Sequence, residues 1–228
     1  MALPDIKQTA TDARLDAVSV PGGASWATAA REAAMARVRK MGLPDRRDEY
    51  WKFTRPDTLI SPAPSEAALF DPSEKPVFGD MDRLCIVFVD GVFDPEASDD
   101  LSLEGVSIER LADVSQADIH WAKDLYGVLE TRGQDPVERP LAALNTAIAS
   151  DGVVLHVTGR VSKPINFVYH HKALTSDATL HHLIKLDPGA DITILETGPA
   201  AARFNKSMEV DVADGAGFHH VRTQGRDH

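Results

Sequence analysis

The sequence is poor in cysteine and has no long apolar segment, and each absence excludes a class of protein. Cys85 is the only cysteine among 228 residues, so the chain cannot form an internal disulfide. It lies in the apolar run Leu84–Val89, which predicts an unreactive strand thiol. No run of 18 apolar residues is present, and the first twenty residues lack the apolar core of a secretory signal. These features predict a soluble cytoplasmic protein without a membrane span.

The sequence also lacks the features of nucleic-acid and nucleotide binding. The formal net charge is −11, and the richest basic stretch, residues 37–55, is interrupted by Asp45, Asp48 and Glu49. Because nucleic-acid phosphates require clustered Lys and Arg, we expect no nucleic-acid partner. Neither a glycine-rich loop ending in Lys-Ser/Thr nor a Gly-x-Gly-x-x-Gly motif after a strand is present, so nucleotide chemistry is not indicated.

What the sequence does contain is a repeat in its last third. Short β-branched runs, each ending in a turn, occupy residues 153–157, 165–169, 180–186, 192–195, 208–212 and 218–221. An offset of 26 residues lays Gly189 onto Gly215 and Ile184 onto Val210. A fixed period of this size is typical of stacked coils, each of which needs a neighbour to bury its apolar face. The repeat predicts a right-handed parallel β-helix from residue 151 onward, and therefore a mainly β fold.

Within these runs apolar and polar residues alternate, as in Met208 and Val210 against Glu209 and Asp211. Alternation with a period of two predicts one buried face and one wet face. The residues expected inside the coil are Ile184, Leu186, Ile192, Ile194, Val210 and Val212.

The first 150 residues predict a different, largely helical domain with mixed elements. Helical spacing occurs at Trp26, Ala30, Ala33, Arg37 and Met41, and again in residues 119–129 and 141–148, and a short helix fits residues 46–53. Asp90-Gly91 between two apolar runs is a strong hairpin signal, and residues 106–110 fit a third strand. The composition changes at residues 150–152. The predicted domains are therefore 1–150 and 151–228.

Three pairs of adjacent histidines lie in the predicted strands: His170-His171, His181-His182 and His219-His220. Histidine clusters suggest a metal site, but neighbouring residues in a strand point to opposite faces, so no pair can chelate one ion. If Ile184 and Leu186 point inward, His182 does so as well and His181 points outward. We assign no metal ligand, and the lack of cysteine in these runs argues against a cluster held by this chain alone.

One pair of acidic residues raises an enzymatic alternative. Glu209 and Asp211 lie two residues apart on one strand face, about 7 Å from each other, and could serve as the acids of a hydrolase or lyase. The β-helix architecture also serves carbohydrate-active enzymes, which makes this the alternative function. The missing secretory signal counts against it, because such substrates are mostly outside the cell.

Two segments of the chain resemble a known family. Residues 46–54 resemble the N-terminal signature of the SufB/SufD family of iron–sulfur cluster assembly proteins. Residues 143–153 resemble the segment that leads into that family's β-helix, in a form closer to SufD than to SufB. The hairpin in residues 84–95 and Pro164-Ile165 are similar to the family as well. The residues of the two motifs, whose roles are not assigned, are Arg47, Glu49, Trp51, Lys52, Asn145, Asp151 and Gly152.

The resemblance implies a non-catalytic, SufD-like scaffold subunit of the cytoplasmic SUF system. Such a subunit pairs with a SufB-like paralogue through the β-helix and works with the SufC ATPase, which docks on a C-terminal region beyond His228. The resemblance places no catalytic, cofactor or metal residue in this chain; an iron–sulfur cluster belongs to the assembled complex. Family members are roughly twice as long. We therefore expect a fragment or a truncated gene product whose open last coil either self-associates or frays.

Trp51 and Lys52 leave two interpretations open. They form a docking element for a partner, or Trp51 is an aromatic anchor of the N-terminal domain while Arg47 or Lys52 pairs with Glu49 on the surface.

Overall fold

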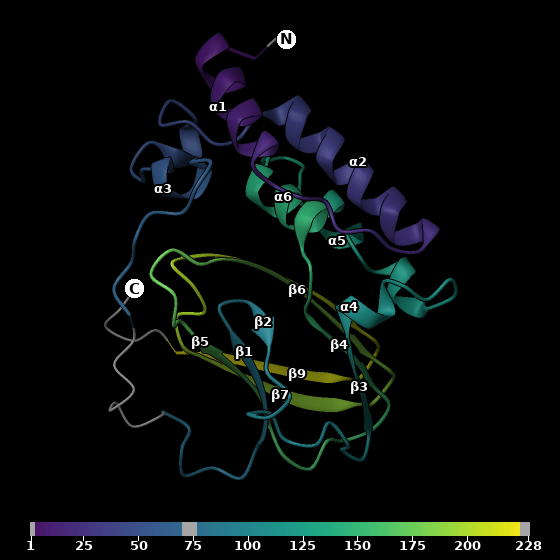
Figure 1. Cartoon of the computed structure of the whole chain (residues 1–228). Helices are drawn as coiled ribbons and strands as arrows, with labels where there is room; N and C mark the ends of the chain where they lie inside the picture. Colours follow the sequence, from purple (N-terminus) through teal and green to yellow (C-terminus); the bar gives the residue numbers. More distant parts are fainter. Residues whose placement is uncertain (1–2, 70–76, 224–228) are drawn as a thin grey trace.

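The computed structural model describes residues 3–69 and 77–223, and it separates helices from strands along one direction of the molecule. A layer of helices covers one of the two sheets (Figure 1). The helices are α1 (Asp5–Asp16), α2 (Ser25–Met41), α3 (Asp57–Ile60), α4 (Leu111–Val114), α5 (Val128–Arg132) and α6 (Pro140–Ile148), with 3-10 turns at Glu49–Trp51 and Trp121–Asp124. The strands are β1 (Leu84–Val89), β2 (Val92–Phe93), β3 (Val106–Arg110), β4 (Val153–Val157), β5 (Ile165–His170), β6 (Asp177–Leu186), β7 (Asp191–Thr197), β8 (Arg203–Val212) and β9 (Gly217–Arg222).

The strands form two mixed sheets, in the orders β2-β1-β5-β7-β9 and β3-β4-β6-β8. From β4 to β9 successive strands alternate between the two sheets, and every pairing among them is parallel. Helical and strand residues are about equally numerous, so the expectation of a mainly β fold is wrong: the chain is mixed α/β. Among the described residues the two sheets do not close into a solenoid.

The predicted offset of 26 residues is confirmed between the later strands. Ile184 lies beside Val210 in β6 and β8, and Ile192 lies beside Phe218 in β7 and β9. Gly189 and Gly215 occupy equivalent turns with φ of 74° and 71°, a conformation that favours glycine. The preceding coil has an offset of 29 instead, as between residues 165 and 194.

The three additional residues lie in the turn of residues 171–176, between β5 and β6. Val168 pairs with Thr197 at the offset of 29, whereas Asp177 pairs with Arg203 at the offset of 26. The turn is held from outside the coil, because the Asp90 carboxylate accepts hydrogen bonds from the backbone N–H groups of Lys172 and Ala173. The longer first coil explains why the sequence repeat is visible only in its later part.

Strands from the first 150 residues complete both sheets. The predicted hairpin is present, with Asp90 and Gly91 at φ of 49° and 83°, and β1 pairs in parallel with β5. The predicted strand at residues 106–110 pairs antiparallel with β4. The domain boundary predicted at residue 150 lies between α6 and β4 and stays a prediction. Each sheet contains strands from both sides of that boundary.

The apolar core lies between the two sheets. Phe88, Leu155, Phe167 and Ile194 are fully or almost fully buried there. Of the six residues expected inside the coil, Ile184, Leu186, Ile192 and Ile194 are buried, Val210 is half-buried and Val212 is 46% exposed. The last expectation is wrong because β8 is an edge strand, with no described strand stacked on it.

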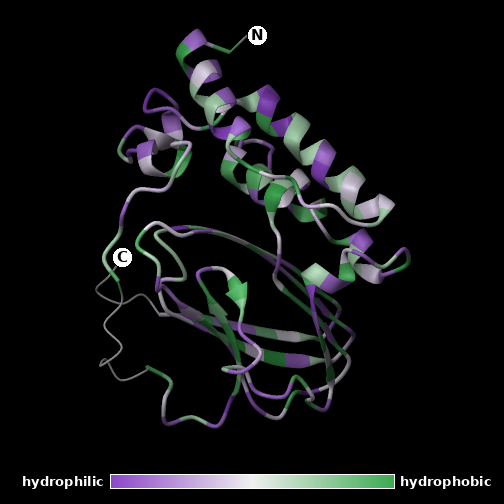
Figure 2. Cartoon of the chain, in the orientation of Figure 1, coloured by the Kyte–Doolittle hydropathy of each residue, from purple (hydrophilic) through white to green (hydrophobic). Residues whose placement is uncertain are grey.

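Within the helical layer, apolar side chains of α2 pack against those of α6 (Figure 2). The span of α2 agrees with the sequence, and its predicted face agrees in part: Met41 is buried, whereas Ala33 is exposed. The other buried positions include Ala34, Met35 and Val38. These side chains pack with Ala143 and other residues of α6. No helix in the described parts of the chain is both long and apolar enough to cross a bilayer.

Two other helical expectations are corrected by the structure. Residues 46–53 form only one 3-10 turn, Glu49–Trp51. The segment 119–129 is broken at Gly127, which has a φ of 73°, into a 3-10 turn and α5, and Ile119 is 88% exposed. A left-handed residue ends a helical turn whatever the apolar spacing around it.

Ile194→Asp should destabilise the fold by about 4 kcal/mol or more, because it places an unpaired charge between the sheets. The adjacent half-exposed residue provides the control: Thr193→Asp should lower the free energy of unfolding by less than about 1 kcal/mol. Chemical denaturation measures both. Equal values for the two variants would contradict the inward orientation of Ile194.

Candidate functional site

The interface between the helical layer and the β3-β4-β6-β8 sheet contains a buried carboxylate. Glu209 on β8 is 3% exposed. Its carboxylate accepts hydrogen bonds from the backbone N–H groups of Gly127 and Glu130, the latter at 2.7 Å, and from His181 Nε2 at 2.9 Å. The first turn of α5 is thereby fixed to the sheet by hydrogen bonds that the negative charge strengthens.

His181 and Tyr126 fill the space beside Glu209. The two rings lie with centroids 4.7 Å apart, and the Tyr126 hydroxyl donates to the Thr146 carbonyl oxygen at 2.6 Å. Burial raises the pKa of Tyr126 to about 12, with the nearby Arg31 opposing the shift. Tyr126 therefore stays a neutral hydrogen-bond donor that connects the segment before α5 to α6.

This interface corrects two sequence expectations. Glu209 and His181 point away from the coil interior, as the alternation predicts, but at these two positions the outward face is dry because the helical layer covers it. The carbohydrate-enzyme alternative required Glu209 as an acid beside Asp211. Glu209 is already bound by three donors, whereas Asp211 is exposed, so the alternative loses this residue.

His182 lies inside the coil, as predicted. Its Nδ1 accepts from the Val153 N–H at 2.9 Å, so Nε2 carries the proton and donates to the Tyr169 hydroxyl at 2.9 Å. The ring contacts Phe167 at a centroid distance of 4.8 Å. Burial lowers the pKa of His182 well below its usual value, with positive groups nearby adding to the effect. The ring is therefore neutral.

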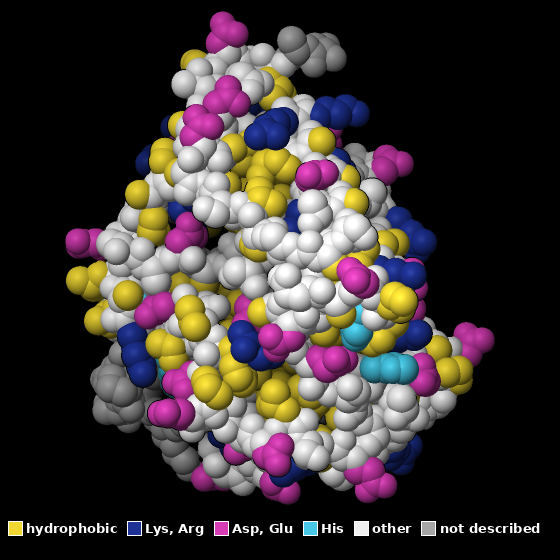
Figure 3. All heavy atoms as spheres, turned by 45° about the vertical axis from the view of Figure 1, so that its right-hand side comes forward, with side chains coloured by type: hydrophobic (Ala, Val, Ile, Leu, Met, Phe, Trp, Pro, Cys, Tyr) yellow, Lys and Arg dark blue, Asp and Glu magenta, His cyan; other side chains and the backbone are white. Residues whose placement is uncertain are grey.

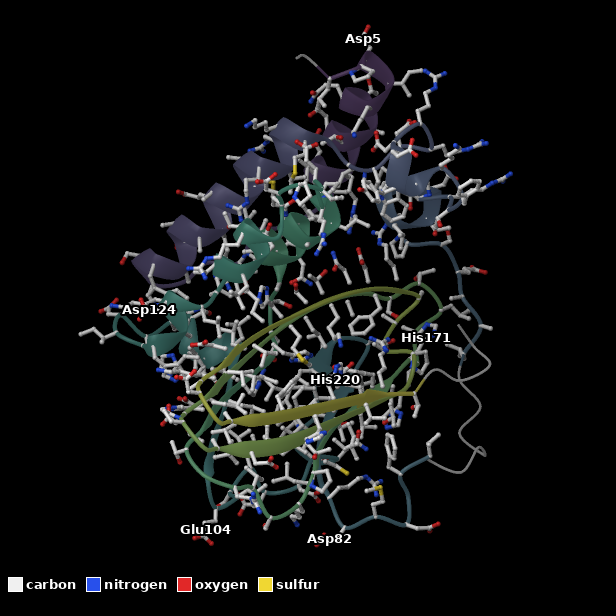
Figure 4. The ribbon with its side chains drawn as sticks, turned by 180° about the vertical axis from the view of Figure 1, so that it is seen from behind. Asp5, Asp82, Glu104, Asp124, His171 and His220 are labelled. Atoms are coloured by element: carbon white, nitrogen blue, oxygen red, sulfur yellow. The ribbon has the colours of Figure 1, made fainter. Side chains whose placement is uncertain are left out.

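The histidine pairs do not assemble a metal centre. His171 is buried and contacts the Ala173 carbonyl oxygen, whereas His219 is exposed. Figure 4 labels His171, in the turn after β5, and His220, on β9, at separate places. In residues 3–69 and 77–223, no group of three His, Cys, Asp or Glu side chains is arranged to hold a metal ion.

A second buried carboxylate lies at the last coil. Glu196 on β7 is fully buried; it forms an ion pair with Lys206 of β8 and a hydrogen bond with the ring Nε2 of His220 on β9, the latter at 3.0 Å. Arg222 lies 3.6 Å from the same carboxylate. Burial lowers the pKa of Lys206, and the Glu196 charge offsets part of that shift. Polar residues thus replace the apolar core where the stacked strands reach their last described members.

β8 and β9 form adjacent edges of the two sheets. No described strand pairs with their outer sides. Gly217 and Thr223 donate their backbone N–H groups to the carbonyl oxygens of Ala190, just before β7, and Glu196, so residues 218, 220 and 222 direct theirs to the open edge. Val212 and Val221 are each 46% exposed here. Such an edge can accept a strand from another chain.

The second motif, residues 143–153, connects the helical layer to the sheet. Asn145 donates from Nδ2 to the carbonyl oxygens of Leu180 and Asn205, both at 3.0 Å, and so ties α6 to β6 and β8. Asp151 pairs with Arg110 and accepts from the Gly152 N–H at 2.8 Å. A Cβ at Gly152 would lie 1.9 Å from the His181 carbonyl oxygen, so only glycine fits there.

The first motif is largely on the surface. Arg47, Glu49 and Lys52 are exposed, and Trp51 is half-buried. Phe53 is the most exposed of the large hydrophobic side chains in the described residues, at 92%, and the Lys52 ammonium lies 5.4 Å from its ring centroid. The structure brings this motif near neither the second motif nor the buried carboxylates.

Cys85 is half-buried on β1, where burial raises the pKa of its thiol. A raised pKa disfavours the thiolate, which agrees with the expectation of an unreactive strand thiol.

The arrangement is a helical layer hydrogen-bonded to one of two mixed sheets, whose edge strands β8 and β9 pair with no described strand on their outer sides. The model of the SufBD protein N-terminal region matches residues 22–166, which include both motifs and the helical layer from α2 to α6. This match covers more than half of the chain, which therefore belongs to the SufB/SufD family of iron–sulfur cluster assembly proteins. A search of curated proteins found no match.

Glu209→Gln should lower the free energy of unfolding by about 2–4 kcal/mol, because an amide cannot satisfy three donors as a carboxylate does. Asp211→Asn, on the same strand face but exposed, should change it by less than about 0.5 kcal/mol. Denaturant titrations of the two variants provide the test. Similar losses in both would mean that Glu209 does not join the layers.

Stability should fall as the pH drops below about 6.5, by up to about 1.4 kcal/mol per pH unit for His182. The folded pKa of His182 is depressed, so the unfolded chain binds the proton first and acid favours unfolding. His182→Gln should flatten this dependence, whereas His219→Gln, at an exposed position, should not. Denaturation of the parent and of both variants between pH 5 and pH 8 measures how the free energy of unfolding depends on pH. If His182→Gln left this dependence unchanged, His182 would not be the buried neutral group described here.

Proposed function

We propose that this chain is a SufD-like, non-catalytic scaffold subunit of an iron–sulfur cluster assembly complex. Membership of the SufB/SufD family supports a role in cluster assembly and is the observation that carries the proposal. The subunit acts in the cytoplasm with a SufB-like paralogue and a SufC-like ATPase. The iron–sulfur cluster is the product of the complex and not a resident cofactor of this chain.

The β4–β9 region constitutes the first coils of a right-handed parallel β-helix. Three features support this assignment: strict alternation of the strands between two sheets, parallel pairing throughout, and the equivalent glycine turns at residues 189 and 215. Coils of this kind expose a flat edge on which further strands can stack.

The buried carboxylates support a scaffold role, because internal partners occupy them. Glu209 binds two backbone N–H groups and a histidine, Glu196 binds a lysine and a histidine, and Asp151 binds an arginine and a backbone N–H group. Groups satisfied in this way hold elements together. On the face shown in Figure 3, acidic and basic side chains are interspersed, without a broad basic field.

The edge strands β8 and β9 are the proposed contact with the SufB-like paralogue. The outward N–H and C=O groups of residues 218, 220 and 222 can pair with a strand of the partner, and half-buried side chains such as Val210 and Phe218 can be covered by it. A second copy of the chain can use the same edge, which makes self-association the competing reaction.

Val212→Lys combined with Val221→Lys should reduce co-purification with the SufB-like paralogue about tenfold or more, since lysines on an edge strand oppose strand addition. Both side chains are already 46% exposed, so the fold should survive. Co-expression followed by affinity capture and quantification of the paralogue measures the effect. When the paralogue is absent, size-exclusion chromatography at high protein concentration should show that the parent self-associates more than the variant.

The matched control is Val92→Lys on β2, the opposite edge of the same sheet, where Val92 is 67% exposed. It should leave both capture and self-association unchanged. If the control reduced capture as strongly as the β8/β9 variant, or if neither did, the proposed contact would be wrong.

A further inference from the structure

A cavity of about 260 Å³ lies where α1 and α6 meet the strands β6, β8 and β9. One wall is apolar and consists of leucine and isoleucine side chains of α6 together with Leu59. The other wall carries four cationic side chains, Arg14, Arg203, Lys206 and Arg222, together with the carboxylate of Asp177. The four cations come from α1, β8 and β9, three elements that the fold brings together.

The cations at this cavity outnumber the carboxylates that pair with them. Asp177 binds both Arg14, at 3.0 Å, and Arg203, at 2.6 Å. Glu196 binds Lys206 and lies 3.6 Å from Arg222. Among residues 3–69 and 77–223, four cations therefore share two carboxylates, which leaves an excess of two positive charges at this cavity, in a chain whose formal net charge is −11.

Burial makes this excess costly. Arg14 and Arg203 are only 3% and 5% exposed, so water solvates them poorly. Although burial raises the pKa of Asp177, the hydrogen bonds and charges of Arg203 and Arg14 outweigh it and hold that pKa below its usual value. Burial also lowers the pKa of Arg14, an effect that Asp177 opposes and the neighbouring Arg203 increases.

Arg14 also keeps a polar atom without a partner. Its Nη1 donates to the Pro62 carbonyl oxygen and its Nη2 to Asp177, but Nε is buried and has no hydrogen bond among the described residues. Arg203 differs, since it uses Nε, Nη1 and Nη2 on Asp177 and on the carbonyl oxygen of Ser61. Both guanidinium groups therefore hold the 57–62 segment, but of the two only Arg14 keeps a buried N–H group without a partner among the described residues.

We propose that this cavity binds a small organic oxyanion, a carboxylate or phosphate ester whose charged end faces the four cations and whose apolar part lies against α6. Guanidinium groups favour such planar or tetrahedral oxyanions, because they combine charge with several fixed N–H donors. The bound anion neutralises the two excess charges and joins α1 to the last described strands, so it stabilises the contact between the helical layer and the coil.

Phenyl phosphate is the probe, because it combines a dianion with a flat apolar ring. Calorimetric titration of the whole chain, at constant ionic strength in chloride, should give saturable binding with a Kd below about 1 mM. Inorganic phosphate should bind more weakly, and phenol, which has no charge at neutral pH, should not bind. Hexanoate in place of phenyl phosphate distinguishes a carboxylate ligand from a phosphate ester.

Arg222→Gln should weaken phenyl phosphate binding about tenfold, since it removes one charge-assisted contact while leaving Lys206 on Glu196. The side chain of Arg222 is 28% exposed, so the variant should fold. Arg222→Lys should retain most of the affinity. Arg132→Gln, an exposed arginine of α5 outside the cavity, should bind like the parent.

The proposal is overturned if phenyl phosphate gives no saturable heat beyond that of chloride. It is also overturned if Arg222→Gln and Arg132→Gln reduce binding equally, because the anion would then respond only to overall charge. Capture of the SufB-like paralogue is measured separately, so failure here does not affect the proposed scaffold role.

Discussion

The fold depends on one buried carboxylate at the boundary between helices and strands. Glu209 gives the N–H groups at the start of α5 a strong acceptor in a place that water cannot reach. Without it those donors would be buried and unpaired, which is among the larger penalties that a single residue can impose. Asn145 performs the corresponding task for α6, so two polar side chains fix the helical layer to the sheet.

The same constraint explains the local sequence of the second family motif. Chain direction changes between α6 and β4, and the strand that follows must lie close to β6. Gly152 permits this close approach because it has no Cβ, while Asp151 binds Arg110 and orders the turn. The motif is therefore a requirement of packing. The first motif has no comparable explanation in the contacts of this chain.

Much of the strand region could be predicted from the sequence, because alternation and a 26-residue period follow directly from parallel stacking. The hairpin at Asp90-Gly91 could also be predicted from the sequence, since both turn residues have positive φ and few residue types adopt that conformation. Alternation reports only which side of a strand a residue occupies, and so it could not reveal that helices cover Glu209. The break at Gly127 was missed because apolar spacing continues across it.

The turn of residues 171–176 has a consequence for how this architecture can vary. It contains the three additional residues of the first coil, yet the strands before and after it keep their pairing partners. Asp90, which belongs to the hairpin and not to the coil, secures it by accepting backbone N–H groups. This turn can therefore take insertions or deletions: the chain length can change there while the spacing of the stacked strands stays constant.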